Sequence, residues 1–132
     1  MKKSALLIAS LLALAAVLTA CGPKKIVLEI EMKEFTFIPD TFTVPAGTEV
    51  TLNLTNSGAL EHEWVIMIYG KEATIPFNED DEANIFWEHE LDAGAEASVT
   101  FTSPSQPGEY QVVCGTPGHL EQGMKGKLVV TE

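Results

Sequence analysis

Residues 110–130 read YQVVCGTPGHLEQGMKGKLVV and carry the strongest indication of the fold. Both of its ends alternate apolar with other side chains, as half-buried β-strands do. Between these ends, glycines and a proline allow a short loop that folds back on itself. The loop spaces a thiol, an imidazole and a thioether as C-x4-H-x4-M, so that Cys114, His119 and Met124 converge on one point.

The same two-residue period recurs in the chain before this stretch. The run 64–69 has apolar or aromatic side chains on both faces, which predicts a strand that is buried on both sides. Phe35 and Phe37 fall out of phase with Met32, which predicts a bulge or bend. Seven or eight short strands in one domain favour an all-β sandwich. The other period-2 runs are 26–32, 50–54, 97–101, 110–114 and 128–130, with turn signals at 45–47, 56–58, 92–94, 104–108 and 123–126.

Residues 70–94 form a long, acidic connection that departs from this spacing. Its aromatic and aliphatic residues indicate that part of it packs against the domain. A short strand around 85–91 and a helical turn near 79–84 are both possible. His89 lies in this connection outside any motif, and we interpret it as structural or solvent-facing.

A second histidine, His62, precedes the doubly apolar run and shares its parity with Trp64, so its ring should point into the end of the sandwich. Two imidazoles, a thiolate and a thioether form a donor set typical of blue-copper electron-transfer sites. Zinc more often takes further cysteine, histidine or carboxylate ligands. The sequence therefore predicts one copper ion held by His62, Cys114, His119 and Met124.

The chain resembles the cupredoxins, the small blue-copper proteins that include plastocyanin, azurin and auracyanin. Its loop spacing is most similar to that of auracyanin. The resemblance covers essentially residues 26–131. It rests on FTFIP at 35–39, FTVPAGTEV at 42–50, LTN at 54–56, PGEY at 107–110, the C-x4-H-x4-M loop, and MKGKLVV at 124–130.

The resemblance implies a Greek-key β-sandwich with copper at one end, bound by the same four residues, and Met124 as the long axial contact. It also implies that the Glu61 carbonyl lies near the opposite axial position. Many members place asparagine after the first histidine, but this chain has Glu63 there. Its backbone N–H can still reach the sulfur. Electrons would pass through the His119 edge at an apolar patch that would comprise Leu60, Pro117, Gly118 and Leu120.

The N-terminus reads as an export signal. A positive start and the apolar run 5–20 end in LTAC at 18–21, which resembles a bacterial lipobox. This predicts a signal peptide at 1–20, a lipid (palmitate) on Cys21, a linker at 21–25 and one domain at 26–132. The protein would then be anchored at the outer face of the cytoplasmic membrane. An uncleaved transmembrane helix is the alternative.

From Cys21 onward the chain carries six lysines against 19 acidic residues, a net charge of −13. Such a charge disfavours nucleic acid as a partner. We expect a monomeric electron carrier, not an enzyme, whose partners are redox proteins such as a cytochrome or a membrane oxidase or reductase complex. A copper storage or delivery module would use the same fold. A copper enzyme would need a further substrate-binding metal, and a sandwich with a vestigial site would not keep all four ligands.

Overall fold

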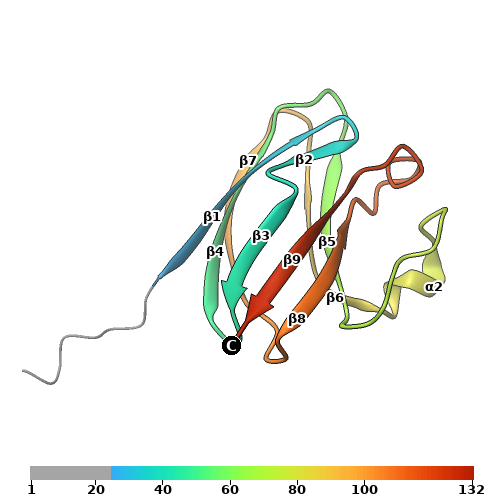
Figure 1. Ribbon diagram of the computed structural model, residues 1–132. Helices are drawn as coiled ribbons and strands as arrows, with labels where there is room; N and C mark the ends of the chain where they lie inside the picture. Colours follow the sequence, from blue (N-terminus) through green and yellow to red (C-terminus); the bar gives the residue numbers. More distant parts are fainter. Residues whose placement is uncertain (1–24) are drawn as a thin grey trace, which may run out of the picture.

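The computed structural model describes residues 25–132, which form a sandwich of two β-sheets (Figure 1). The predicted signal peptide and Cys21 lie outside these residues. The elements are β1 (Ile26–Lys33), β2 (Thr36–Ile38), β3 (Thr41–Pro45), β4 (Glu49–Asn56), β5 (His62–Met67), α2 (Glu79–Glu82), β6 (Ile85–Leu91), β7 (Glu96–Thr102), β8 (Gly108–Val113) and β9 (Lys125–Thr131).

The four-stranded sheet has the order β2-β1-β4-β7, and the five-stranded sheet has the order β3-β9-β8-β5-β6. Strands β1 and β4 run parallel, as do β3 and β9, whereas the other pairs are antiparallel. The all-β sandwich is therefore confirmed, with nine strands in the described residues instead of seven or eight. The sequence pattern underestimated the number because β2 has three residues, too few to show a two-residue period.

The main core lies between the sheets and is filled by the inward-facing residues of each strand. Strand β4 shows the pattern most clearly, since Val50, Leu52 and Leu54 are fully buried and alternate with partly exposed polar residues. Trp64 of β5 joins the two sheets, because its ring packs edge-on against Phe37 and Phe42 at centroid distances of 5.0 and 4.8 Å.

A second, smaller core lies on the outer face of the five-stranded sheet. Val65, Met67, Val113 and Leu120 are buried there, and Phe77 of the long connection packs against them. This arrangement confirms the prediction that strand β5 is buried on both faces. Both expected elements of the connection are present, because α2 supplies the helical turn and β6 supplies the strand.

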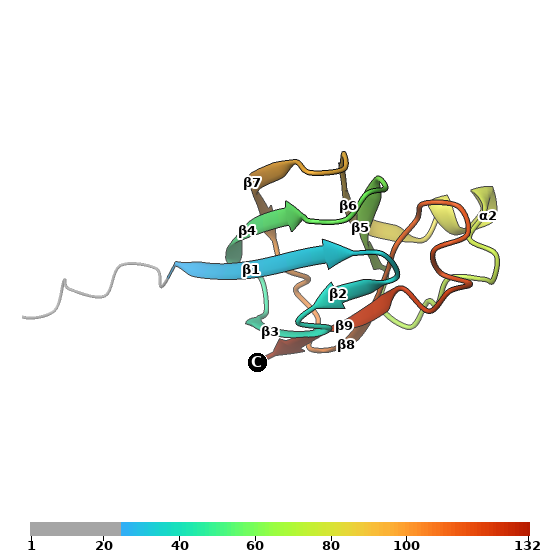
Figure 2. The same ribbon diagram turned by 90° about the horizontal axis from the view of Figure 1, so that it is seen from above.

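Three connections meet at the end of the sandwich opposite the C-terminus: the β1–β2 turn, the β4–β5 loop and the β8–β9 loop (Figures 1 and 2). The predicted bend near Phe35 is a tight hairpin turn, in which Lys33 of β1 pairs with Thr36 of β2. Within residues 25–132 no helix is long and apolar enough to cross a membrane.

Candidate metal centre

Two neighbouring strands deliver the first two predicted ligands to the same end of the sandwich. His62 is the first residue of β5, and Cys114 directly follows the last residue of β8. These strands pair, with Val65 opposite Val113. Both side chains are fully buried, and for His62 this confirms the prediction from its shared parity with Trp64.

The β8–β9 loop returns His119 to the same point. The Nδ1 atoms of His62 and His119 are 3.1 Å apart, and the Cys114 Sγ atom lies 3.9 Å from the first and 3.4 Å from the second. Within the described residues, these three side chains form the one group of histidine, cysteine or carboxylate side chains that could hold a metal ion. His89 lies outside this group and stacks on Trp87, in agreement with a structural role.

The spacing of these donor atoms fits one metal ion. In zinc sites, the metal bonds imidazole nitrogen at about 2.0–2.1 Å and thiolate sulfur at about 2.3 Å, so two bonds bridge gaps of up to about 4.1–4.4 Å. All three separations observed here, from 3.1 to 3.9 Å, are shorter than these limits. A thiolate with two imidazoles is the set that favours copper.

Met124, the fourth predicted ligand, lies at the end of the same loop, directly before β9. Its side chain is fully buried. Its backbone N–H donates to the His119 carbonyl at 3.0 Å, and its own carbonyl accepts from the Cys114 N–H at 3.1 Å. The backbone thus ties the predicted axial ligand to both of its loop neighbours.

Burial sets the protonation of the metal-free site. It lowers the pKa of both histidines, and His119 lowers that of His62 further, so both imidazoles are neutral and have a free lone pair. Burial also raises the pKa of the Cys114 thiol, against the effect of the Glu63 N–H. A metal ion must therefore displace the thiol proton when it binds.

Residues next to His62 brace the ligand loop. The Glu63 N–H donates to Cys114 Sγ at 3.4 Å, as expected, and the Glu63 side chain lies against the backbone of Gly115. Burial and the nearby carboxylates of Glu88 and Glu90 raise the pKa of Glu63 to about 7. The Thr116 hydroxyl donates to the Glu61 carbonyl at 3.3 Å. An axial role for this carbonyl stays a prediction.

The surface beside His119 differs from the expected patch. Leu60, Pro117 and Gly118 are exposed, but Leu120 is buried in the second core because it packs beneath the long connection. Phe35 is 38% exposed and lies edge-on to the His119 ring, with centroids 5.3 Å apart. The sequence did not indicate this contact, because the out-of-phase position of Phe35 predicts only a bend.

Comparisons with known proteins agree with this geometry. A family model described as "Cupredoxin-like domain" matches residues 4–130. Auracyanin-B of Chloroflexus aurantiacus is 33% identical over 72% of this chain and 47% of its own length, so the chain spans about half of that relative. Auracyanin-A of the same organism is 30% identical over 95% of each chain.

Two further matches concern copper by name. The solved structure of auracyanin A from Chloroflexus aurantiacus, described as a "blue" copper protein, superposes with a TM-score of 0.66 at 29% identity and covers 82% of this chain and 100% of its own. A "copper-resistant cuproprotein", CopI of Rubrivivax gelatinosus, is 32% identical over 71% of this chain and 59% of its own length.

Proposed function

The chain belongs to the cupredoxin family, and from that premise we propose that it carries single electrons between redox partners as a type 1 (blue) copper protein. Its cofactor is a single copper ion. The observation that carries the proposal is a donor set of two imidazoles and a thiolate that is almost fully buried. His62 and Cys114 are fully buried, and His119 is 5% exposed.

Such burial favours electron transfer over catalysis, because a substrate has no open position at the site. When bound, copper supplies the exchange of one electron between its two oxidation states. The chain holds the ligands still: β5 and β8 fix His62 and Cys114, and the backbone bonds of Met124 close the loop that carries His119. A rigid site needs little rearrangement when its charge changes.

The test is the visible spectrum of the purified chain loaded with copper(II), compared with a Cys114→Ser variant. We expect an intense blue thiolate-to-copper absorption in the wild type that ascorbate bleaches reversibly, and none in the variant. A His89→Ala variant is the matched control and should stay blue, since His89 lies outside the ligand group. A colourless wild type loaded with copper(II) would refute the proposal.

Copper handling is the second candidate, and the match to a cuproprotein named for copper resistance favours it. A protein of this kind would bind copper(I) tightly and release it to a competing acceptor. Copper(I) binding without a blue copper(II) form would support this function in place of electron carriage.

We propose further that the chain is a lipoprotein, anchored by a lipid on Cys21 at the outer face of the cytoplasmic membrane. The LTAC sequence at 18–21 after an apolar run supports this. Radiolabelled palmitate should label the wild type, and a Cys21→Ala variant should lose the label. If the wild type takes up no label and the Cys21→Ala variant still remains in the membrane fraction, an uncleaved transmembrane helix would be the anchor instead.

A further inference from the structure

The β1–β2 turn has an unusual residue at its tip. Glu34 and Phe35 are its two central residues, between the paired Lys33 and Thr36. Phe35 has a φ of +64°, and within residues 25–132 it is the one residue other than glycine with a positive φ. The second central position of a turn with this geometry normally holds glycine or asparagine. A bulky residue there is strained, and such strain is concentrated at functional sites.

The first tip residue, Glu34, holds the loop that leads to His62. One of its carboxylate oxygens accepts the backbone N–H of Ala59, and it also accepts the N–H of Leu60 at 3.2 Å. A side chain on Gly58 would collide with this carboxylate, so the glycine permits the close approach. From the inner side, the buried Asn56 side chain donates to the Leu60 carbonyl at 2.8 Å. The loop is therefore fixed from two sides.

The second tip residue, Phe35, lies on the other histidine. Its ring meets the His119 ring edge-on, at an interplanar angle of 86°. The neighbours Pro117 and Gly118 are exposed, yet His119 is 5% exposed, so Phe35 is part of what covers this imidazole. One two-residue turn thus contacts both the segment before the first predicted ligand and the ring of the third.

We propose that Glu34 and Phe35 form a clamp that holds the two imidazoles at metal-binding distance before copper arrives. Both are positioning residues, since they act through the loop before His62 and through the His119 ring. The strain at Phe35 is maintained because glycine would satisfy the turn but could not cover His119. This inference rests on the proposed copper function.

The test compares copper(II) affinity, measured on the full-length chain by competition with a chelator, between clamp variants and matched controls. Phe35→Gly and Glu34→Ala should each weaken binding by about 10–100-fold, the usual effect of removing a residue that orients a metal ligand. Glu34→Gln keeps an acceptor oxygen and should restore most of the affinity. The thermal unfolding of copper-free Phe35→Gly should match the wild type, because glycine relieves the strain of the turn.

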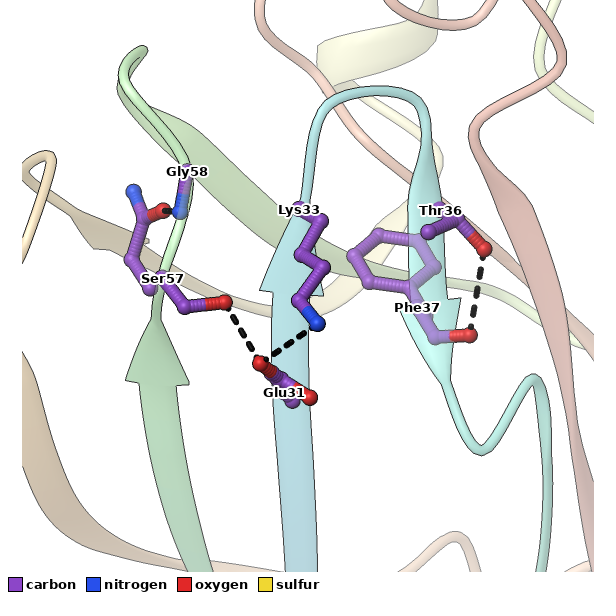
Figure 3. A network of polar contacts seen from close by, with 7 residues as sticks. Glu31, Lys33, Thr36, Phe37, Ser57 and Gly58 are labelled. Atoms are coloured by element: carbon purple, nitrogen blue, oxygen red, sulfur yellow. Dashed lines mark hydrogen bonds and ion pairs between the residues drawn. The ribbon is translucent and has the colours of Figure 1, made fainter.

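The controls alter similar residues that contact neither the Ala59 and Leu60 amides nor the His119 ring. Phe86→Gly removes a phenylalanine of similar exposure, 41% against 38%. Glu31→Ala removes a glutamate of strand β1, which accepts from the Ser57 hydroxyl at the start of the β4–β5 loop at 2.6 Å and pairs with the Lys33 ammonium at 2.9 Å (Figure 3). Both controls should keep the wild-type affinity for copper(II).

A second measurement needs no metal. In the copper-free wild type, the Ala59 and Leu60 amide protons should exchange slowly with solvent, and Glu34→Ala should abolish this protection while Glu31→Ala keeps it. The clamp is refuted if both clamp variants bind copper(II) as tightly as the wild type, or if these amides exchange freely in the wild type. A wild type that does not turn blue would refute the proposed function instead.

Discussion

Burial at the metal centre has opposite consequences for metal binding by its histidines and by its cysteine. Burial keeps the imidazoles of His62 and His119 neutral, which leaves their nitrogen lone pairs free for a metal. The same burial keeps Cys114 protonated. Copper uptake should therefore release one proton, and the thiolate becomes stable only when the metal is bound.

A leucine in place of Met124 separates the packing role of this side chain from its predicted role as a copper ligand. We expect Met124→Leu to cost less than about 1.5 kcal/mol of unfolding free energy, because the two side chains have similar volume and the site is fully buried. The reduction potential should rise, because the thioether predicted to ligate the copper would stabilise the oxidised ion and leucine offers it no electron pair.

Voltammetry and thermal unfolding check this prediction together. Met67→Leu, at a fully buried methionine of the second core, is the control and should leave the potential unchanged. An unchanged potential in Met124→Leu would mean that Met124 only packs.

Among the elements, the connection between β5 and β6 is fixed by one buried carboxylate. Asp81, which is 2% exposed, accepts the Thr74 N–H at 2.9 Å, the Thr74 hydroxyl at 2.8 Å and the Asn78 N–H at 3.0 Å. Burial alone would raise its pKa, but these hydrogen bonds outweigh burial and lower it. The connection covers the second core, and so supports β5 and β8 from outside.

Asp81→Asn should destabilise the copper-free domain at neutral pH by about 1–3 kcal/mol, since an amide cannot accept all three bonds. The pKa of this carboxyl is lower in the folded than in the unfolded chain, where it is about 3.9, so its charged form stabilises the fold at higher pH. This stabilisation is lost as the pH falls through the pKa of the folded chain. The difference in unfolding free energy between wild type and variant should therefore become smaller below about pH 4.

Thermal unfolding of both proteins from pH 7 down to pH 3 measures this difference. Asp80→Asn, at the exposed neighbouring position, is the control and should show almost no difference at any pH. A difference for Asp81→Asn that is independent of pH would show that the charge of its carboxylate is not responsible.

At the scale of the whole molecule, net charge bears on the choice of partner. The chain from Cys21 onward has a charge of −13, which favours encounter with a basic redox protein. Electrostatic steering raises association rates by about 10–10³-fold and is screened beyond about 10 Å at 0.1 M salt.

We therefore expect electron exchange with a basic cytochrome c to slow steeply as ionic strength rises, measured by stopped-flow absorbance of the blue band. With an acidic cytochrome as control, the rate should rise with salt. A flat profile for the basic partner would leave the acidic surface with a role in solubility alone.

Most of the strands, and the three donor side chains that the structure brings together, could be predicted from the sequence, because both depend on short-range order. A two-residue period places the side chains of strands such as β4 in the core whatever the fold is, and the C-x4-H-x4-M spacing keeps three donors within one loop. His62 could be added because strand parity fixes the direction in which a side chain points. The packing of the connections depends on tertiary structure, which buries Leu120 under the long connection and brings Glu34 and Phe35 onto the loops of His62 and His119. These contacts join segments far apart in the chain, so they depend on how the two sheets pack and leave no local pattern in the sequence.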